Sequence, residues 1–160
     1  MKTLYHTIIL IVLLAFIGEG CTTTGKSANK CGPCPLYFAE VLPNLGFRVF
    51  DKATGKNLFF GPGAPYKPSQ LVMMQLVNGK PDSARLFADT ANQSFRVYVV
   101  PNHTVDTVTM NIANKPQDAL LFKTGTTEGC CPQLELVSVT YDGTVVYTTP
   151  DGPKIVSLSK

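Results

Sequence analysis

Apolar and polar side chains alternate along most of the chain after Gly46, and this period of two indicates β-strands. The clearest case is Thr107–Ile112, where every second residue is Val, Met or Ile and the residues between are Thr or Asn. Ser94–Val100 shows the same alternation more weakly. Apolar runs predict further strands at Phe47–Phe50, Asn57–Phe60, Leu71–Leu76, Ala84–Ala88, Ala119–Phe122, Leu134–Tyr141, Thr144–Thr148 and Lys154–Leu158.

Turn-forming residues separate these runs. Asp142-Gly143 lies between two β-rich segments and predicts a tight hairpin, because Gly tolerates the positive φ of such a turn. Asn78-Gly79-Lys80-Pro81 predicts a second turn, and Asp51–Lys56 a longer hairpin connection. The segment Gly61–Pro65 is expected to be irregular, since its prolines cannot donate to a ladder.

Short strands at such intervals predict an all-β fold, an antiparallel β-sandwich of immunoglobulin-like or transthyretin-like type. At most one short helix is expected, at Pro35–Leu42, where a proline can occupy the first helical position and Pro43 would end the helix. The stretch Gly46–Leu58 loosely resembles the opening hairpin of carboxypeptidase-regulatory-like and transthyretin-like sandwiches. That resemblance implies the same sandwich class.

The N-terminus has the pattern of a secretory signal. One cation, Lys2, precedes ten apolar residues, Ile8–Ile17, and small residues then lead to Cys21. Ten residues are too few to span a bilayer, which needs roughly 20. Residues 1–20 are therefore predicted to be a signal peptide. The polar residues 21–30 are predicted to be a tether, and residues 31–160 a single domain.

The motif Ile17-Gly18-Glu19-Gly20-Cys21 resembles a bacterial lipobox, with Gly18 and Glu19 in place of the usual Leu and small residue. The resemblance implies lipidation of Cys21. Taken whole, the chain resembles the small β-rich lipoproteins of Gram-negative cell envelopes. That likeness implies an extracytoplasmic domain anchored by its lipid to a membrane, with the outer membrane expected and its periplasmic or surface face left open.

The other four cysteines are expected to form two structural disulfides in an oxidising compartment. They are Cys31, Cys34, Cys130 and Cys131. A bond between the adjacent Cys130 and Cys131 is disfavoured, because neighbouring Cα atoms are about 3.8 Å apart and a disulfide needs about 4.4–6.8 Å. Two pairings remain, each joining the early pair to the late pair. Gly129 and Pro132 predict the irregular backbone that both pairings require.

Two alternatives for these cysteines remain open. Cys31-Gly32-Pro33-Cys34 is identical to the thioredoxin active-site motif, which implies thiol–disulfide exchange with Cys31 exposed at a helix start. However, a polar tether precedes the motif here, and a run of strands follows it. Zinc bound by four thiolates is the other alternative, but adjacent ligands depart from the usual spacing. We therefore expect neither a metal nor another cofactor.

A nucleotide site is not expected, although Gly20–Ser27 matches the P-loop pattern. The match straddles the predicted cleavage site, and Gly32, Pro33 and Pro35 stand where the helix of a P-loop would run. The net charge is +3, and removal of residues 1–20 leaves it unchanged. So mild a charge predicts neither nucleic-acid binding nor an acidic partner, and no run of Lys or Arg suggests a basic stripe.

Catalytic groups are sparse in the sequence. His103 is the single histidine of the predicted mature chain; Asp106 is near it, and the acidic residues are scattered. The sequence thus favours a non-enzymatic binding or structural module of the envelope, with an envelope protein or a glycan as ligand. A carbohydrate- or peptide-binding accessory lipoprotein is a further alternative; it would need an aromatic platform, for which Tyr66, Tyr98, Tyr141 and Tyr147 are candidates in a chain without Trp.

Overall fold

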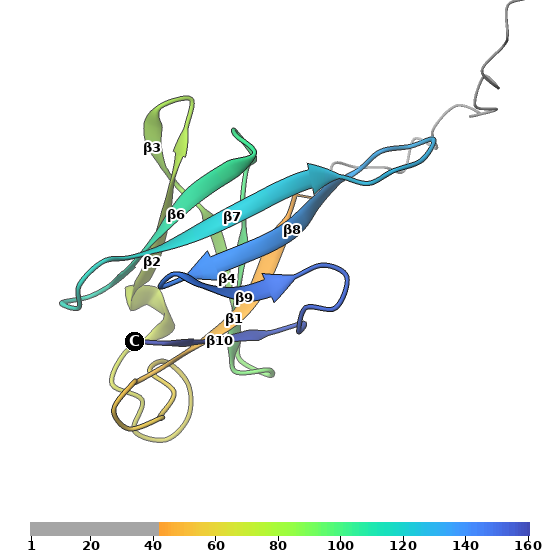
Figure 1. Cartoon of the computed structure of the whole chain (residues 1–160). Helices are drawn as coiled ribbons and strands as arrows, with labels where there is room; N and C mark the ends of the chain where they lie inside the picture. Colours follow the sequence, from red (N-terminus) through yellow and green to blue (C-terminus); the bar gives the residue numbers. More distant parts are fainter. Residues whose placement is uncertain (1–41) are drawn as a thin grey trace, which may run out of the picture. The chain divides into compact units, whose positions relative to one another are not determined.

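The computed structural model describes residues 42–160, and this part of the chain is an all-β sandwich (Figure 1). The fold class predicted from the alternation of side chains is confirmed. The strands are β1 Asn44–Phe50, β2 Leu71–Val77, β3 Lys80–Ser83, β4 Arg85–Asp89, β5 Ser94–Tyr98, β6 Val105–Ile112, β7 Asp118–Thr126, β8 Leu134–Tyr141, β9 Thr144–Thr148 and β10 Val156–Ser159. A single 3₁₀ turn, η1 Pro68–Gln70, precedes β2 within the same residues.

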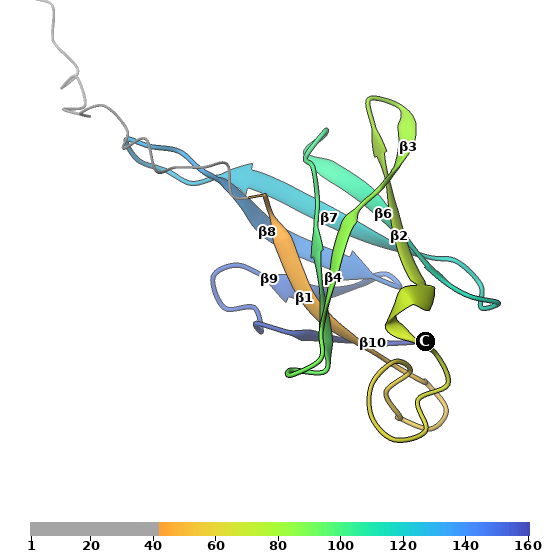
Figure 2. The same ribbon diagram turned by 180° about the vertical axis from the view of Figure 1, so that it is seen from behind.

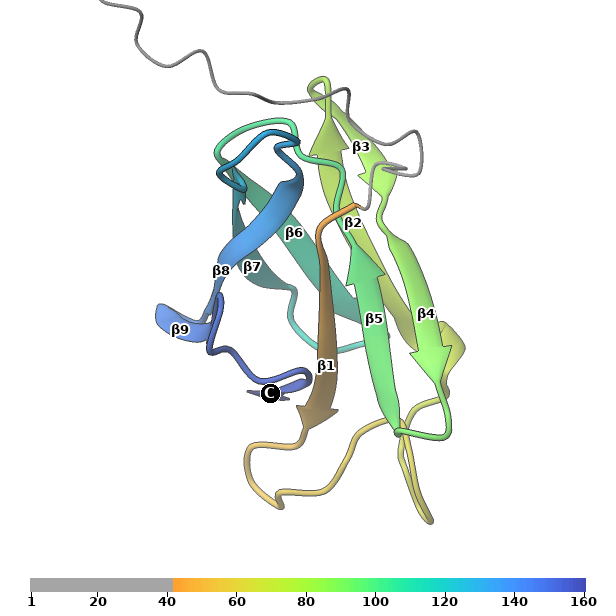
Figure 3. The same cartoon turned by 90° about the vertical axis from the view of Figure 1, so that its right-hand side faces the viewer.

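Two sheets form the layers of the sandwich within residues 42–160. One sheet has four strands in the order β10-β1-β5-β4, and the other has six in the order β3-β2-β6-β7-β8-β9. Figure 3 shows β1, β5 and β4 side by side as one layer, with β2, β6 and β7 behind them. The pairs are antiparallel except β1 and β10, which run parallel with Phe47 opposite Val156. The last strand thus departs from the purely antiparallel pattern expected from sequence.

The chain crosses from the six-stranded sheet to the four-stranded sheet between β3 and β4. These two strands belong to different sheets and are separated by Ala84, which is buried and whose N–H donates to Met73 O at 2.9 Å. On the opposite side of the sandwich, the chain leaves edge strand β9 and enters edge strand β10 of the other sheet (Figure 2). Chain crossings therefore join the sheets on both sides.

The core lies between the sheets and consists of the alternate side chains that the sequence pattern assigns to the inner faces. Phe47 and Phe95 fill it from the four-stranded sheet, and Met110 and Phe122 from the six-stranded sheet; all are at most 1% exposed. Phe59 packs edge-on against Phe95, with ring centroids 5.1 Å apart. Burial of large side chains on this scale contributes about 1.5–3 kcal/mol each before entropy costs.

The segment Asn57–Phe60 is not a strand, so that prediction was wrong. Asn57 makes one isolated bridge to Phe50, and its Oδ1 then accepts hydrogen bonds from the N–H groups of Phe59 and Phe60 at 2.9 and 3.0 Å. This side-chain turn competes with the ladder for the same backbone donors. Leu58 and Phe59 still enter the core, which explains why the segment is apolar.

The predicted tight turns form, with one change of extent. Asp142 and Gly143 have φ of 49° and 72°, and Asn78 and Gly79 have φ of 52° and 74°, as two-residue primed turns require. Lys80 and Pro81, however, do not belong to the second turn but begin β3. Pro is tolerated there because β3 is an edge strand with a ladder on one side.

Among residues 42–160 there is no helix long and apolar enough to cross a membrane. The helix expected at Pro35–Leu42 lies outside the described residues except for Leu42, which is not helical.

Candidate functional site

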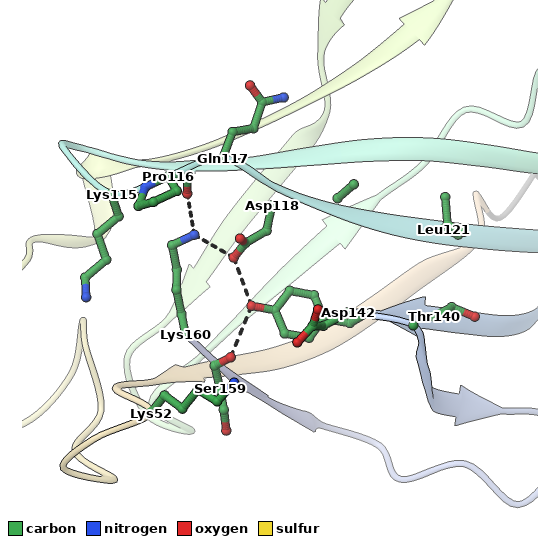
Figure 4. Close-up of a pocket in the computed structure, with 13 residues that line it drawn as sticks. Lys52, Lys115, Pro116, Gln117, Asp118, Leu121, Thr140, Asp142, Ser159 and Lys160 are labelled. Atoms are coloured by element: carbon green, nitrogen blue, oxygen red, sulfur yellow. Dashed lines mark hydrogen bonds and ion pairs between the residues drawn. The ribbon is translucent and has the colours of Figure 1, made fainter.

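A hollow on the described surface lies at the end of the sandwich where β8 and β10 end and β7 begins (Figure 4). It has a volume of about 660 Å³. We call it the Asp118 cleft, after the carboxylate at its centre. Its walls are Lys52 after β1, Lys115, Pro116 and Gln117 before β7, Asp118, Ala119 and Leu121 on β7, Thr140 and Tyr141 on β8, Asp142 and Gly143 in the hairpin, and Ser159 and Lys160 at β10.

A hydrogen-bond network centred on Asp118 forms the base of the cleft. Asp118 Oδ2 accepts from Lys160 Nζ at 2.6 Å and from the Tyr141 hydroxyl at 2.9 Å. Lys160 Nζ also donates to Pro116 O, and Tyr141 OH lies 3.2 Å from Ser159 O. Since Tyr141 belongs to β8 and Ser159 to β10, the network connects the two sheets (Figure 4).

Backbone hydrogen bonds set the position of Lys160. Its N–H donates to Phe50 O at 2.8 Å, and its carbonyl oxygen accepts from Lys52 N–H at 2.7 Å. These bonds continue the parallel pairing of β10 with β1 beyond the last paired residues. As a result, the Lys160 side chain is directed across the base of the cleft and is only 7% exposed.

The rim of the cleft carries two further lysines. Lys115 Nζ is 3.7 Å from Asp51 Oδ2, a long contact between partly exposed groups. Lys52 is exposed, and its ammonium has no hydrogen-bond or ion-pair partner among residues 42–160. An exposed ion pair of this length contributes little to stability, so both ammonium groups can pair with an incoming anion.

Asp51 takes part chiefly in a local turn. Its Oδ1 accepts from Thr54 N–H at 2.8 Å, from Thr54 Oγ1 at 2.9 Å and from Ala53 N–H at 3.1 Å. The hydrogen bonds from Thr54 are the main cause of its lowered pKa. The carboxylate therefore stabilises the connection that presents Lys52 to the cleft.

Burial raises the pKa of the Tyr141 hydroxyl, and the hydrogen bond to Asp118 adds to the increase. Removal from water disfavours the phenolate, and a neighbouring carboxylate repels it. The hydroxyl thus stays protonated at neutral pH and acts as a hydrogen-bond donor. A general base or a nucleophile would need the opposite shift.

The residues predicted to carry chemistry near the N-terminus precede the part of the chain that the structure describes. Cys21, Cys31 and Cys34, together with the P-loop-like segment, lie outside the described residues. Cys130 and Cys131 lie in the connection between β7 and β8, whose backbone is irregular as expected from its sequence. The disulfide pairing therefore stays a prediction.

His103 and Asp106 do come together, but not as a catalytic pair. Asp106 is buried, and its carboxylate accepts hydrogen bonds from the backbone N–H groups of Asn102 and His103, at 3.0 and 3.1 Å. The imidazole belongs to an exposed residue. The carboxylate thus organises the loop before β6. Within residues 42–160, no group of three or more His, Cys, Asp or Glu side chains could hold a metal ion.

The four tyrosines do not share one platform. Tyr66 packs on Phe59, with ring centroids 5.9 Å apart, and Tyr98 contacts Phe87 on the four-stranded sheet. Tyr141 belongs to the Asp118 cleft, and Tyr147 is on edge strand β9. The aromatic patch expected for a carbohydrate-binding end of the sandwich is therefore not built from this set.

Sequence reasoning did not identify the Asp118 cleft. Asp118, Tyr141 and Lys160 are far apart in the chain and belong to no motif. A weak signal was available, since Asp118 and Tyr141 stand at the beginning and end of strands that pair. However, the sequence contains no indication that Lys160, directly after β10, would lie beside them.

No family model matches this sequence, and comparisons with curated proteins and with solved structures return no match.

Proposed function

We propose that this chain is a lipid-anchored envelope protein whose sandwich is a non-enzymatic binding module, with the Asp118 cleft as its ligand site. The observation that carries the proposal is the division of roles within the cleft. The Asp118 carboxylate accepts hydrogen bonds from the Tyr141 hydroxyl and from Lys160. The ammonium groups of Lys52 and Lys115, by contrast, stay available at the rim. Such an arrangement suits recognition rather than proton transfer.

The lining indicates the chemistry of the ligand. Two ammonium groups favour a carboxylate, whereas Pro116, Ala119 and Leu121 offer an apolar wall. Leu121 is 41% exposed and Val145, on the same outer face of the six-stranded sheet, is 58% exposed. An acidic peptide segment with alternate apolar residues matches this combination. We therefore propose a peptide segment of an envelope protein as the ligand.

Binding of defined peptides to the full chain in detergent tests the cleft. The probes are a fluorescein-labelled Glu-Leu-Glu-Leu peptide and its Gln-Leu-Gln-Leu counterpart, followed by fluorescence anisotropy. The acidic peptide is expected to bind more tightly, and a Lys52→Gln, Lys115→Gln double variant should weaken it at least fivefold. Equal binding of the two peptides, or no effect of the double variant, would refute the cleft as the site. Lys80→Gln, exposed on β3, is the control for loss of charge.

The extracytoplasmic location and the lipid anchor rest on Met1–Gly20 and the lipobox-like residues before Cys21. Labelled palmitate supplied to a Gram-negative host that expresses the full chain tests both. Incorporation and recovery in the membrane fraction should be lost in Cys21→Ser and kept in Cys34→Ser. Unchanged incorporation in Cys21→Ser would contradict lipidation at this residue.

Two disulfides between the Cys31/Cys34 pair and the Cys130/Cys131 pair complete the proposal, because an envelope domain is exposed to oxidising conditions. They would close loops of about 100 residues, and the first is expected to add roughly 4–5 kcal/mol of stability.

A further inference from the structure

The outer face of the four-stranded sheet holds every arginine of the chain. The sequence contains three, Arg48, Arg85 and Arg96, and they are on β1, β4 and β5. Alternation along each strand places them on the face opposite the core, because their neighbours Phe47, Val49, Phe95 and Val97 are buried. Figure 3 shows these three strands side by side.

Strand register turns the three positions into a diagonal. Phe87 on β4 pairs with Arg96 on β5, and Arg85 pairs with Tyr98. Arg96 in turn lies opposite Gly46 on β1, two residues before Arg48. Each step of the diagonal is one strand across and two residues along, which corresponds to roughly 8 Å between Cα atoms.

Aromatic rings accompany the arginines on this face. Phe87 is 53% exposed and contacts Tyr98 edge to face, with ring centroids 5.6 Å apart. Phe87 lies two residues after Arg85 on β4 and opposite Arg96, and Tyr98 lies two residues after Arg96 on β5 and opposite Arg85. Charged and flat apolar groups therefore alternate over neighbouring positions.

A second hollow lies at the Arg48 end of the diagonal. It has a volume of about 290 Å³ and polar walls, and Arg48, Asn92 and Gln93 line it. Arg48 Nη2 donates to Asn92 O at 2.8 Å, whereas its Nε is buried without a hydrogen-bond partner among residues 42–160. The buried Nε does not face a ligand, but Nη1 makes no hydrogen bond within residues 42–160 and remains as a donor for an anionic group.

Among residues 42–160, negative charge on this face is limited to Asp89, at the edge of the same row as Arg48. Its Oδ2 accepts from Asn92 Nδ2 at 2.8 Å and its Oδ1 from Asn92 N–H at 3.0 Å. The carboxylate is therefore engaged by the β4–β5 turn. Three guanidinium groups and one occupied carboxylate leave an excess of positive charge across the diagonal.

We propose that this face, named the arginine diagonal, binds an acidic polysaccharide. Its guanidinium groups would pair with successive sugar carboxylates, and Phe87 and Tyr98 would pack against sugar rings. Arg is suited to this task because its planar fork matches a carboxylate through two parallel hydrogen bonds. The choice of a glycan over a nucleic acid rests on the proposed extracytoplasmic location and on the mild net charge of +3.

Titration of the full chain in detergent with purified oligogalacturonate, a chain of carboxylated sugars, tests the proposal. Neutral dextran is the uncharged probe and a single-stranded oligothymidylate is the polyanion control, all at one ionic strength. Oligogalacturonate is expected to bind best. Arg96→Gln and Arg85→Gln should each weaken it about tenfold, and Phe87→Ala about fivefold.

Two further variants sharpen the result. Arg96→Lys should recover only part of the lost affinity if two-pronged pairing is used. Lys80→Gln removes an exposed charge from the other sheet and should leave the affinity unchanged. Because Arg85 and Arg96 are exposed on different strands, one variant keeps the test valid if the other misfolds.

Several results would overturn the proposal. They are no binding of oligogalacturonate, equal losses in Arg96→Gln and Lys80→Gln, or tighter binding of oligothymidylate, which would make this a nucleic-acid surface. Failure of palmitate labelling, or of peptide binding at the Asp118 cleft, would refute the proposed function. Neither result would affect the titration with oligogalacturonate, because that measurement depends on neither the lipid nor the peptide.

Discussion

Asp118 is the residue on which the Asp118 cleft depends. It accepts hydrogen bonds from Lys160 on the continuation of β10 and from Tyr141 on β8, so one side chain joins three parts of the fold. The Lys160 side chain is 7% exposed and that of Asp118 is 26% exposed. A pair so placed gains more from its geometry than a surface pair does, because water screens it less.

Asp118→Asn should destabilise the protein by about 1–3 kcal/mol, because the Lys160 ammonium loses its counter-charge while it remains largely buried. Urea unfolding followed by circular dichroism measures the change. Asp142→Asn is the matched control: Asp142 lines the same cleft, is exposed, and has a positive φ that Asn also accepts. Equal stability of the two variants would contradict the assigned role of Asp118.

Tyr141 should make the stability of the fold depend on alkaline pH. Its pKa is raised in the folded state, so the folded protein keeps a proton that the unfolded chain loses near pH 10. The contribution is complete below about pH 10 and decreases as pH rises above that value. Tyr141→Phe should flatten this part of the stability–pH curve. The same curve for wild type and Tyr141→Phe would rule the effect out.

At the scale of elements, alternation predicted the strands well where one face is buried and the other exposed. The segment Thr107–Ile112 lies within β6, and the predicted bounds of β8 and β9 are those observed. The strand predicted at Asn57–Phe60 is absent because Asn57 Oδ1 accepts hydrogen bonds from the N–H groups of Phe59 and Phe60. An apolar segment can therefore enter the core without joining a sheet. β3 was missed because Pro81 suggested a turn, although an edge strand accepts proline.

The pairing of β10 with β1 depends on a glycine. A Cβ at Gly46 would lie 2.7 Å from Lys154 O and 3.4 Å from a side-chain carbon of Ile155. The first neighbour is backbone and cannot move without displacing the entry to β10. The chain can therefore approach β1 so closely only where β1 has no side chain.

Gly46→Ala should destabilise the protein by about 1–3 kcal/mol through overpacking at this crossing. Thermal unfolding measures it, and the exposed Ser157→Ala on β10 serves as the control. The damage should spread to the Asp118 cleft, since Lys160 is positioned by the same pairing. If Gly46→Ala melted at the wild-type temperature, Lys154 would not approach Gly46 as closely as the structure indicates.

At the scale of the molecule, the arrangement of charge differs from what composition indicates. A net charge of +3 without a run of Lys or Arg predicted neither an acidic partner nor a basic stripe. The fold nevertheless brings Arg48, Arg85 and Arg96 onto one sheet face. Residues separated by up to 48 positions meet there because β5 lies between β1 and β4.

The cysteines give the prediction that concerns the whole chain. Mass spectrometry of the mature protein, with and without reduction, should show two bonds that each join Cys31 or Cys34 to Cys130 or Cys131. Reduction should then lower the melting temperature, because long loops in the unfolded chain are released. A readily reduced bond between Cys31 and Cys34 would instead support thiol–disulfide exchange.

The sequence by itself determined the fold class, most strands and the primed turns, because alternation, β-propensity and turn chemistry act over a few residues. Tertiary structure alone decided the parallel placement of β10, the Asp118–Tyr141–Lys160 network and the grouping of the arginines. Each of these depends on which strands become neighbours and in what register. Register is set by the packing of the whole core, so no short segment of sequence contains it.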